Sequence, residues 1–373
     1  MKVAIISRGM PTRKDPLNGI FEFDQAKALA QTGIEVAFVV IDFRAFSYKR
    51  HFGLFKYESE GVHVFELSVP LNVYRRAIPF LQRLLLIPFR AMLKSFGKPD
   101  VVHAHFYSIA AIASILKKKY GLPFVITEHS SKLNRSLADI SALDQKLTRM
   151  AYSTCDRLIC VSETLQSHIK ENFDIDSIVI RDMVDDTCFS YHGERNDTSS
   201  FVYVSVGNLI PLKGFDRLIE AFAEVSNDAR LLIIGDGPEK ELLRQRIDTL
   251  GLSGCVELMG QLERSHINEI FQSCHAFVLN SSSETFGVSC IEAMLTGLPV
   301  VVTRCGGPES FMNDSNGLLV PVNDKGALVD ALRLIRANFS TYNGSDISNQ
   351  IRRRFSPASV AEDIIGVYQA LLR

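Results

Sequence analysis

The sequence Glu-Thr-Phe-Gly-Val-Ser-Cys-Ile-Glu at residues 284–292 decides the expected fold of this chain. The apolar run before it, residues 276–280, is typical of a buried strand, and the serines that follow are typical of a loop. Apolar positions after Gly287 repeat with helical spacing until a Gly-Leu-Pro sequence ends the pattern. We therefore expect Glu284 in the loop after a strand and Glu292 in the next helix. Open α/β sheets bind ligands at this edge.

The start of that helix is a candidate anion site. The backbone N–H groups of Phe286, Gly287 and Val288 should point out of the helix N-terminus, where the helix dipole favours negative charge. A phosphate there, with Glu284 and Glu292 on either side and a glycine that permits close approach, would suit a nucleotide-sugar. The alternative is a solvated first-turn glutamate and a second glutamate on an exposed helix face.

The surrounding sequence favours the first interpretation. The stretch resembles the E-x7-E motif of retaining glycosyltransferases of family 4, which have the two-domain GT-B fold, and the resemblance extends over nearly the whole chain. It includes Gly-Ile-Phe at 19–21, Asp-Val-Val-His-Ala-His at 100–105, Thr-Glu-His at 127–129, Cys-Val-Ser at 160–162, the loop at 206–214, Gly-Asp-Gly-Pro at 235–238, Met-Gly at 259–260 and Cys-Gly-Gly-Pro-Glu at 305–309. The chain is similar to transferases of exopolysaccharide, capsule and cell-wall polysaccharide synthesis.

Composition agrees with a globular protein of two domains. The chain has 373 residues, of which 46% are hydrophobic and 22% charged. Its seven cysteines are odd in number and contain no CxxC pair, so we expect reduced thiols rather than zinc sites or disulfides. No apolar run approaches the length of a transmembrane helix, and Arg8 comes too early for a signal peptide. We therefore expect a cytoplasmic protein.

Strands and helices alternate in both halves of the chain, which is typical of parallel sheets. The polar stretch 190–200 is the natural linker. We expect an α/β protein of the GT-B class, with two Rossmann-like doubly wound domains facing each other across a cleft. The N-terminal acceptor-side domain would span residues 1–189, and the nucleotide-sugar-binding domain residues 190–357. The resemblance implies that the final helix, within residues 358–373, crosses back and completes the first domain.

Lys213 is the main candidate for contacting phosphate. It stands in a glycine-bracketed loop just before a predicted helix, where it could act as a point charge, although a surface lysine in a turn is the alternative. The family usually has an arginine after the first glycine of this loop, where this chain has Asn208. One fixed positive charge is therefore missing. Either Lys213 and the helix start supply more of the positive potential that a phosphate needs, or another basic residue takes the place of the arginine. No Asp-x-Asp pair stands at a strand end, so neither a metal nor another cofactor is expected.

The resemblance implies a role for each remaining residue of the second domain. Glu292 would bind the ribose hydroxyls of the nucleotide. Glu284 and the backbone at 286–288 would contact the transferred sugar and the diphosphate. Gly260 and Gln261 would face the base.

In the first domain, Gly19 lies in a long loop after the first strand, where glycine permits close backbone approach. His129 ends a predicted strand, and the resemblance implies that it hydrogen-bonds the donor sugar or orients the reacting centre. Together with Glu284 and Lys213 it is a candidate catalytic residue, although a lone histidine is more often structural. Asp182 replaces the asparagine that is usual in the family.

Residues 67–99 contain no acidic residue. Six basic residues are interleaved there with apolar ones: Arg75, Arg76, Arg83, Arg90, Lys94 and Lys98. Basic amphipathic stretches bind anionic membrane surfaces, although a packed helix with a solvated basic face is the alternative. No nucleic-acid-binding motif accompanies the stretch, so nucleic acid is not an expected partner. We expect peripheral docking on the inner-leaflet anionic membrane surface.

The sequence thus predicts a retaining glycosyltransferase of the hexosyltransferase class. It would move a sugar from a nucleotide diphosphate sugar, a UDP-sugar being favoured over a GDP-sugar, to a hydroxyl acceptor. That acceptor would be a saccharide or lipid-linked saccharide in surface polysaccharide synthesis. Two alternatives stay open: a nucleotide-sugar 2-epimerase on the same scaffold, and a catalytically inert nucleotide-sugar-binding subunit.

Overall fold

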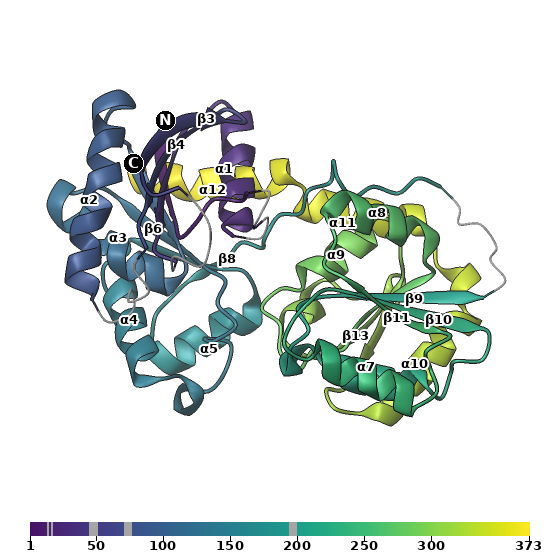
Figure 1. Cartoon of the computed structure of the whole chain (residues 1–373). Coiled ribbons are helices and arrows are strands. Elements are labelled where there is room, and N and C mark those ends of the chain that lie inside the picture. Colours follow the sequence, from purple (N-terminus) through teal and green to yellow (C-terminus); the bar gives the residue numbers. More distant parts are fainter. Residues whose placement is uncertain (13–14, 16–17, 45–50, 71–76, 194–199) are drawn as a thin grey trace. The chain divides into compact units, whose positions relative to one another are not determined.

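The computed structural model describes residues 1–12, 15, 18–44, 51–70, 77–193 and 200–373, and the chain divides into two α/β units (Figure 1). The N-terminal unit comprises Met1–Met183 and Pro357–Arg373, and the C-terminal unit comprises Val184–Ser356. The division falls ahead of the polar stretch at 190–200 because residues 184–189 pack on the C-terminal unit. The N–H of Val184 donates to the carbonyl of Phe355, and the Phe189 ring lies 5.9 Å from that of Phe271.

The N-terminal unit is built on an eight-stranded sheet with the order β3-β4-β2-β1-β5-β6-β7-β8. Its strands are β1 Lys2–Ser7, β2 Glu35–Asp42, β3 Gly53–Ser59, β4 Val62–Ser68, β5 Val101–His105, β6 Phe124–Glu128, β7 Arg157–Cys160 and β8 Ile178–Val179. The described strand pairs are parallel apart from β3–β4, which is antiparallel. The central strands β1, β5 and β6 are almost wholly buried, as expected where helices cover both faces of a parallel sheet.

The helices of this unit are α1 Ile20–Gln31, α2 Ile78–Ser95, α3 Tyr107–Tyr120, α4 Ala142–Tyr152, α5 Glu163–Phe173 and α12 Pro357–Leu372. The last of them, yellow in Figure 1, packs beside α1 although the two lie at opposite ends of the sequence. Val360, Ile364 and Tyr368 on α12 share one buried cluster with Phe23 and Leu29 on α1. The C-terminal helix is therefore part of the N-terminal unit's core.

The C-terminal unit has a six-stranded sheet with the order β11-β10-β9-β12-β13-β14, and its described strand pairs are parallel. The strands are β9 Phe201–Val206, β10 Ala229–Ile234, β11 Val256–Gly260, β12 Ala276–Leu279, β13 Val300–Thr303 and β14 Gly317–Val320. The helices are α6 Phe215–Phe222, α7 Lys240–Thr249, α8 Arg264–Ser273, α9 Val288–Leu295, α10 Lys325–Ala337 and α11 Gly344–Phe355.

The order of the parallel strands reverses between β1 and β5 in the N-terminal unit and between β9 and β12 in the C-terminal unit. Loops that leave the carboxyl ends of such strands diverge to opposite faces of the sheet, and ligands of open α/β folds bind there. The loops after β1 and β5, and those after β9 and β12, are therefore the places to look for site residues.

Candidate functional site

In the C-terminal unit, Lys213 and Glu284 come from the two loops at the point where the strand order reverses. Lys213 ends a short 3-10 turn, Pro211–Lys213, after β9, and Glu284 lies in the loop after β12. The Lys213 Nζ donates to Glu284 Oε1 at 2.5 Å, and the hydroxyl of Ser281 donates to the same oxygen at 2.6 Å. The structure therefore joins two of the three predicted catalytic residues in one ion pair.

The backbone of Glu284 is fixed as well as its side chain. Its N–H donates to the carbonyl of Cys305 at 2.9 Å, and its own carbonyl accepts from the N–H of Gly307 at 3.0 Å. The carboxylate is buried, whereas Lys213 is partly exposed. A lysine ammonium has three N–H donors, so one bond to Glu284 leaves others for a bound phosphate.

Helix α9 begins directly after this loop, at Val288. Its N-cap is Gly287, whose φ of 93° is a left-handed conformation that side chains rarely adopt, and no side chain caps the helix. A Cβ at this glycine would also lie 3.2 Å from Cγ of Pro308. The Phe286 ring is buried against Phe311 and Phe355, so this residue can offer a ligand only its backbone.

Glu292 lies on α9 and is buried beside Arg264, the first residue of α8. The Arg264 guanidinium donates to Glu292 Oε1 from Nη2 at 2.6 Å and from Nε at 3.2 Å. The sequence interpretation did not include Arg264. It could have been found as a basic residue that opens a helix after β11, since that position also lies at the carboxyl edge of the sheet.

The remaining predicted contacts of this unit lie on neighbouring loops of the same edge. Asn208 follows β9 and its side chain is exposed. Gly260 ends β11 with a φ of 75° and accepts from the N–H of Gly235 at 2.8 Å, and the adjacent Gln261 is exposed. Asn208 carries no charge, so the cations that the structure places near the two glutamates are Lys213 and Arg264.

In the N-terminal unit, Gly19 caps α1 with a φ of 78°. A Cβ on it would lie 2.2 Å from the carbonyl oxygen of Gly9, so glycine is required for the loop after β1 to close against the helix start. Glu22, in the first turn of α1, is buried, and neither carboxylate oxygen has a hydrogen-bond partner among the described residues. Its charged neighbour is Arg8, whose Nε lies 3.8 Å from Oε1.

His129 follows β6 at the same edge of the sheet and is buried. Its Nε2 lies 2.8 Å from Nδ1 of His105, and its Nδ1 lies 2.9 Å from Oδ1 of Asp182. The ring N–H is not aligned with that oxygen, so the second contact is an ion pair more than a hydrogen bond. Burial lowers the pKa of His129, but the charge of Asp182, with those of Glu22 and Glu128, outweighs burial and raises it overall.

His103 is wholly buried and bonded within the protein. Its Nδ1 lies 2.6 Å from the Tyr368 hydroxyl and 3.2 Å from Nε2 of Gln25, while its Nε2 lies 2.7 Å from the hydroxyl of Thr127. Burial lowers its pKa to about 3, so it is neutral. These contacts link α12 to the sheet and make His103 a packing residue.

Comparison with known proteins identifies the family of both units. Residues 23–187 match the family model described as Glycosyltransferase Family 4, and residues 192–343 match that described as Glycosyl transferases group 1. Together the two models span most of the chain.

Individual relatives agree. The chain is 28% identical over 332 residues to a subunit of the phosphatidylinositol N-acetylglucosaminyltransferase of Arabidopsis thaliana, covering 85% of this chain and 72% of the relative. It is 33% identical over 177 residues to the lipopolysaccharide core biosynthesis glycosyltransferase LpsD of Rhizobium meliloti, covering 47% and 51%. The solved structure of HepE from Anabaena, in complex with UDP and glucose, superposes with a TM-score of 0.75 at 19% identity, covering 99% of this chain and 100% of HepE. The chain belongs to the group 1 glycosyltransferases of family 4 and has the GT-B fold, with one Rossmann-like sheet in each unit.

Proposed function

We propose that this glycosyltransferase is a retaining enzyme that takes its sugar from a UDP-sugar and transfers it to a hydroxyl of a lipid-linked saccharide in surface polysaccharide synthesis. The observation that carries the proposal is the Lys213–Glu284 ion pair beside the uncapped start of α9. A cation and a helix N-terminus together favour a diphosphate. The fixed carboxylate beside them is suited to accept hydrogen bonds from sugar hydroxyls.

The names of related proteins support the choice of donor and acceptor. HepE has been solved with UDP-glucose, which favours a UDP-sugar here. LpsD acts in lipopolysaccharide core synthesis, and the name of the Arabidopsis relative contains the lipid phosphatidylinositol. An acceptor with a polysaccharide part and a lipid part agrees with both names.

Each residue of the site has a role in this proposal. Glu292, oriented by Arg264, binds the ribose hydroxyls, and Glu284 binds the transferred sugar. Lys213 stabilises the charge that grows on the leaving phosphate, an effect that is strongest in the transition state. The departing phosphate then helps to deprotonate the acceptor on the same face of the sugar, which gives retention. No metal ion is required, because Lys213 and the start of α9 supply the positive potential.

Helix α2 supports docking on an anionic membrane at the cytoplasmic face. Its buried face packs on the sheet. On the opposite face, apolar and basic residues together form one exposed stripe: Phe80, Arg83, Ile87, Arg90 and Lys94. Phe80 and Ile87 are 50% and 43% exposed. Arg75 and Arg76, also predicted to contact lipid, lie outside the described residues. Among the helices that the structure describes, none combines the length and the apolar character needed to cross a membrane.

A donor screen tests the proposal. The protein is incubated with UDP- and GDP-sugars, with and without membrane extract as acceptor source, and released nucleoside diphosphate is measured with and without EDTA. We expect release of UDP that depends on the extract and is unaffected by EDTA, and a product with the donor's anomeric configuration by NMR. Isomerised nucleotide-sugar without acceptor would indicate the 2-epimerase instead. Nucleotide binding without turnover on any donor would indicate an inert binding protein.

A further inference from the structure

The ring of His129 is held from both sides by protein groups. Asp182 approaches one ring nitrogen and His105 the other, at 2.9 Å and 2.8 Å. The His105 ring also stacks on it, with centroids 5.1 Å apart and planes 16° from parallel. Neither nitrogen is left to bond a sugar hydroxyl unless the ring moves, so the side chain can act in this arrangement through its charge and position.

The charged groups around this ring favour a cation. Three carboxylates act on His129, those of Asp182, Glu22 and Glu128. Glu128 precedes it in the chain and accepts from its backbone N–H at 3.1 Å. Arg8 faces it indirectly, lying 4.5 Å from the Phe106 ring, which in turn packs on His129. Among the residues that the structure describes, these three carboxylates and Arg8 make the surroundings of the ring negative.

The two neighbouring histidines, His105 and His103, are neutral and add no positive charge beside His129. Burial lowers the pKa of His105 well below its usual value, as it lowers that of His103. A charged His129 can therefore donate from Nε2 to Nδ1 of a neutral His105 while its Nδ1 stays 2.9 Å from the Asp182 carboxylate as an ion pair.

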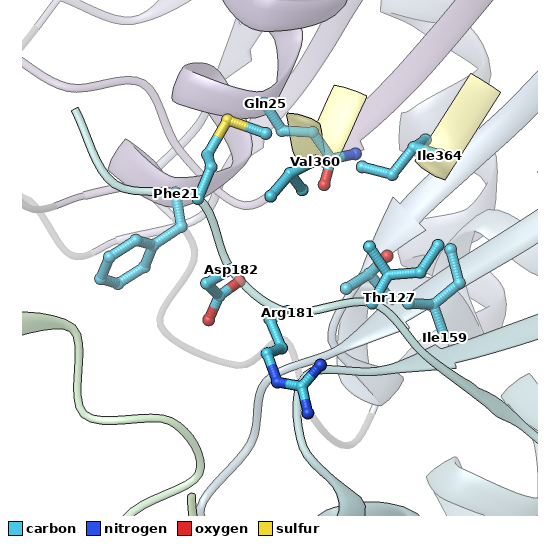
Figure 2. Close-up of a pocket in the computed structure, with 10 residues that line it drawn as sticks. Phe21, Gln25, Thr127, Ile159, Arg181, Asp182, Val360 and Ile364 are labelled. Carbon is cyan, nitrogen blue, oxygen red and sulfur yellow. The ribbon is translucent and has the colours of Figure 1, made fainter. Parts of the chain in front are cut away.

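Asp182 is not neutralised by the arginine next to it. Figure 2 shows the Arg181 guanidinium and the Asp182 carboxylate extending away from each other, around a pocket that Gln25 and Thr127 also line. Arg181 is instead paired with Glu163 of α5. The ion-pair partner of Asp182 is His129.

We propose that Asp182 is a positioning residue for glycosyl transfer, which keeps His129 positively charged and its ring fixed against His105 at the carboxyl edge of the N-terminal sheet. The role in transfer rests on the proposed function. The family usually has an asparagine at this position, which could orient a histidine but could not hold its charge. Compared with the residues usual in the family, Asp182 in place of asparagine favours a charged His129 in the N-terminal unit. Asn208 in place of arginine removes a positive charge from the C-terminal unit.

The test uses Asp182→Asn, which changes the charge at nearly constant shape. The full-length protein is labelled with ¹³C-histidine, the His129 signal is assigned by its loss in His129→Asn, and its titration is followed by NMR. We expect the pKa of His129 to fall by about one pH unit or more in Asp182→Asn. Asp182→Glu should restore part of the difference. The matched control is Asp174→Asn on the exposed C-cap of α5, which should leave the His129 titration unchanged.

The pH profile of sugar transfer gives the second measurement. Because a charged His129 is required, activity should be lost at lower pH in Asp182→Asn than in the wild type, while the control keeps the wild-type profile. An unchanged His129 pKa in Asp182→Asn, or a His129 that is neutral in the wild type at pH 6, would overturn the proposal. The NMR titration needs no substrate, so a donor screen without turnover would refute the proposed function and leave the charge assignment standing.

Discussion

The carboxyl edges of the two sheets differ in the basic residues that pair with their carboxylates. In the C-terminal unit each glutamate of the motif is paired with a permanent cation, Glu284 with Lys213 and Glu292 with Arg264. In the N-terminal unit the residue paired with Asp182 is a histidine, His129, and the charge of a histidine depends on pH. The C-terminal edge is therefore suited to hold an anionic ligand at any physiological pH. The N-terminal edge can respond to proton concentration.

Among the substitutions at the C-terminal edge, Lys213→Ala should have the largest effect on activity. Negative charge grows on the leaving phosphate in the transition state, so we expect kcat to fall by about 100-fold or more while ground-state binding changes much less. Steady-state kinetics and calorimetry with nucleoside diphosphate measure the two effects.

The substitution also leaves the buried Glu284 without its cation, which can destabilise the fold. Lys213→Ala with Glu284→Gln separates the effects, since it should regain thermal stability but not activity. Equal losses of turnover and binding in Lys213→Ala would indicate that the lysine only positions the ligand.

Glu292→Ala should weaken donor binding instead. A carboxylate contact to the ribose diol is worth about 1–3 kcal/mol, so the Kd for nucleoside diphosphate should rise by roughly 5- to 100-fold. Arg264→Ala should have a similar effect in the same direction, because Arg264 orients the carboxylate. Unchanged affinity in calorimetry of Glu292→Ala would rule out the ribose assignment.

The two edges also differ in how far they could be predicted. The places of Lys213, Glu284 and Glu292 at the C-terminal unit's carboxyl edge could be predicted, because they lie in short segments where strand, loop and helix follow one another. The predicted helix over 287–295 corresponds to α9 at Val288–Leu295. Their pairing with each other and with Arg264 was not predicted, since spacing places a residue on an element but does not give its side-chain contacts.

The N-terminal edge combines residues that are distant in sequence. His105, His129 and Asp182 meet only because β5, β6 and the segment after β8 end at the same edge. Asp182 was noted as a departure from the family, but no local pattern joined it to His129. Strands β3, β4 and β8 were also not predicted. The antiparallel β3, for example, has a polar, mostly exposed sequence that lacks the apolar run of a buried parallel strand.

Helix α2 adds fixed charges to the N-terminal unit. If its exposed stripe contacts lipid, each basic residue near the surface contributes about 1 kcal/mol, and Arg83→Glu with Arg90→Glu should release the protein from anionic vesicles in a flotation assay. Binding should weaken as salt rises, and it should not change near neutral pH because arginine does not titrate there.

Arg333→Glu with Arg353→Glu is the matched control, as both residues are exposed on the C-terminal unit. It should keep vesicle binding, and neither double variant should lose affinity for nucleoside diphosphate. Wild-type protein that ignores anionic vesicles at low salt would show that α2 is an ordinary packed helix.

The smallest expected effect concerns stability. A histidine whose pKa is raised by folding contributes stability that is fully present below its unfolded pKa of about 6.5 and is lost as pH rises through the folded value. Asp182→Asn should therefore lower Tm by a few degrees at acidic to neutral pH, and the difference from wild type should shrink in alkaline buffer. A Tm difference that is the same at every pH would mean that Asp182 acts through packing rather than through charge.

The position of α12 has a consequence for biosynthesis. Its Tyr368 hydroxyl meets His103, and its apolar side chains fill the core against α1. The ribosome makes most of the first unit of this chain early but supplies α12 only after the whole C-terminal unit has been made. While the C-terminal unit is synthesised, the core of the N-terminal unit therefore lacks α12 and is partly exposed. Ribosome-bound chains that stop before Pro357 should be more open to protease in the first unit than in the second.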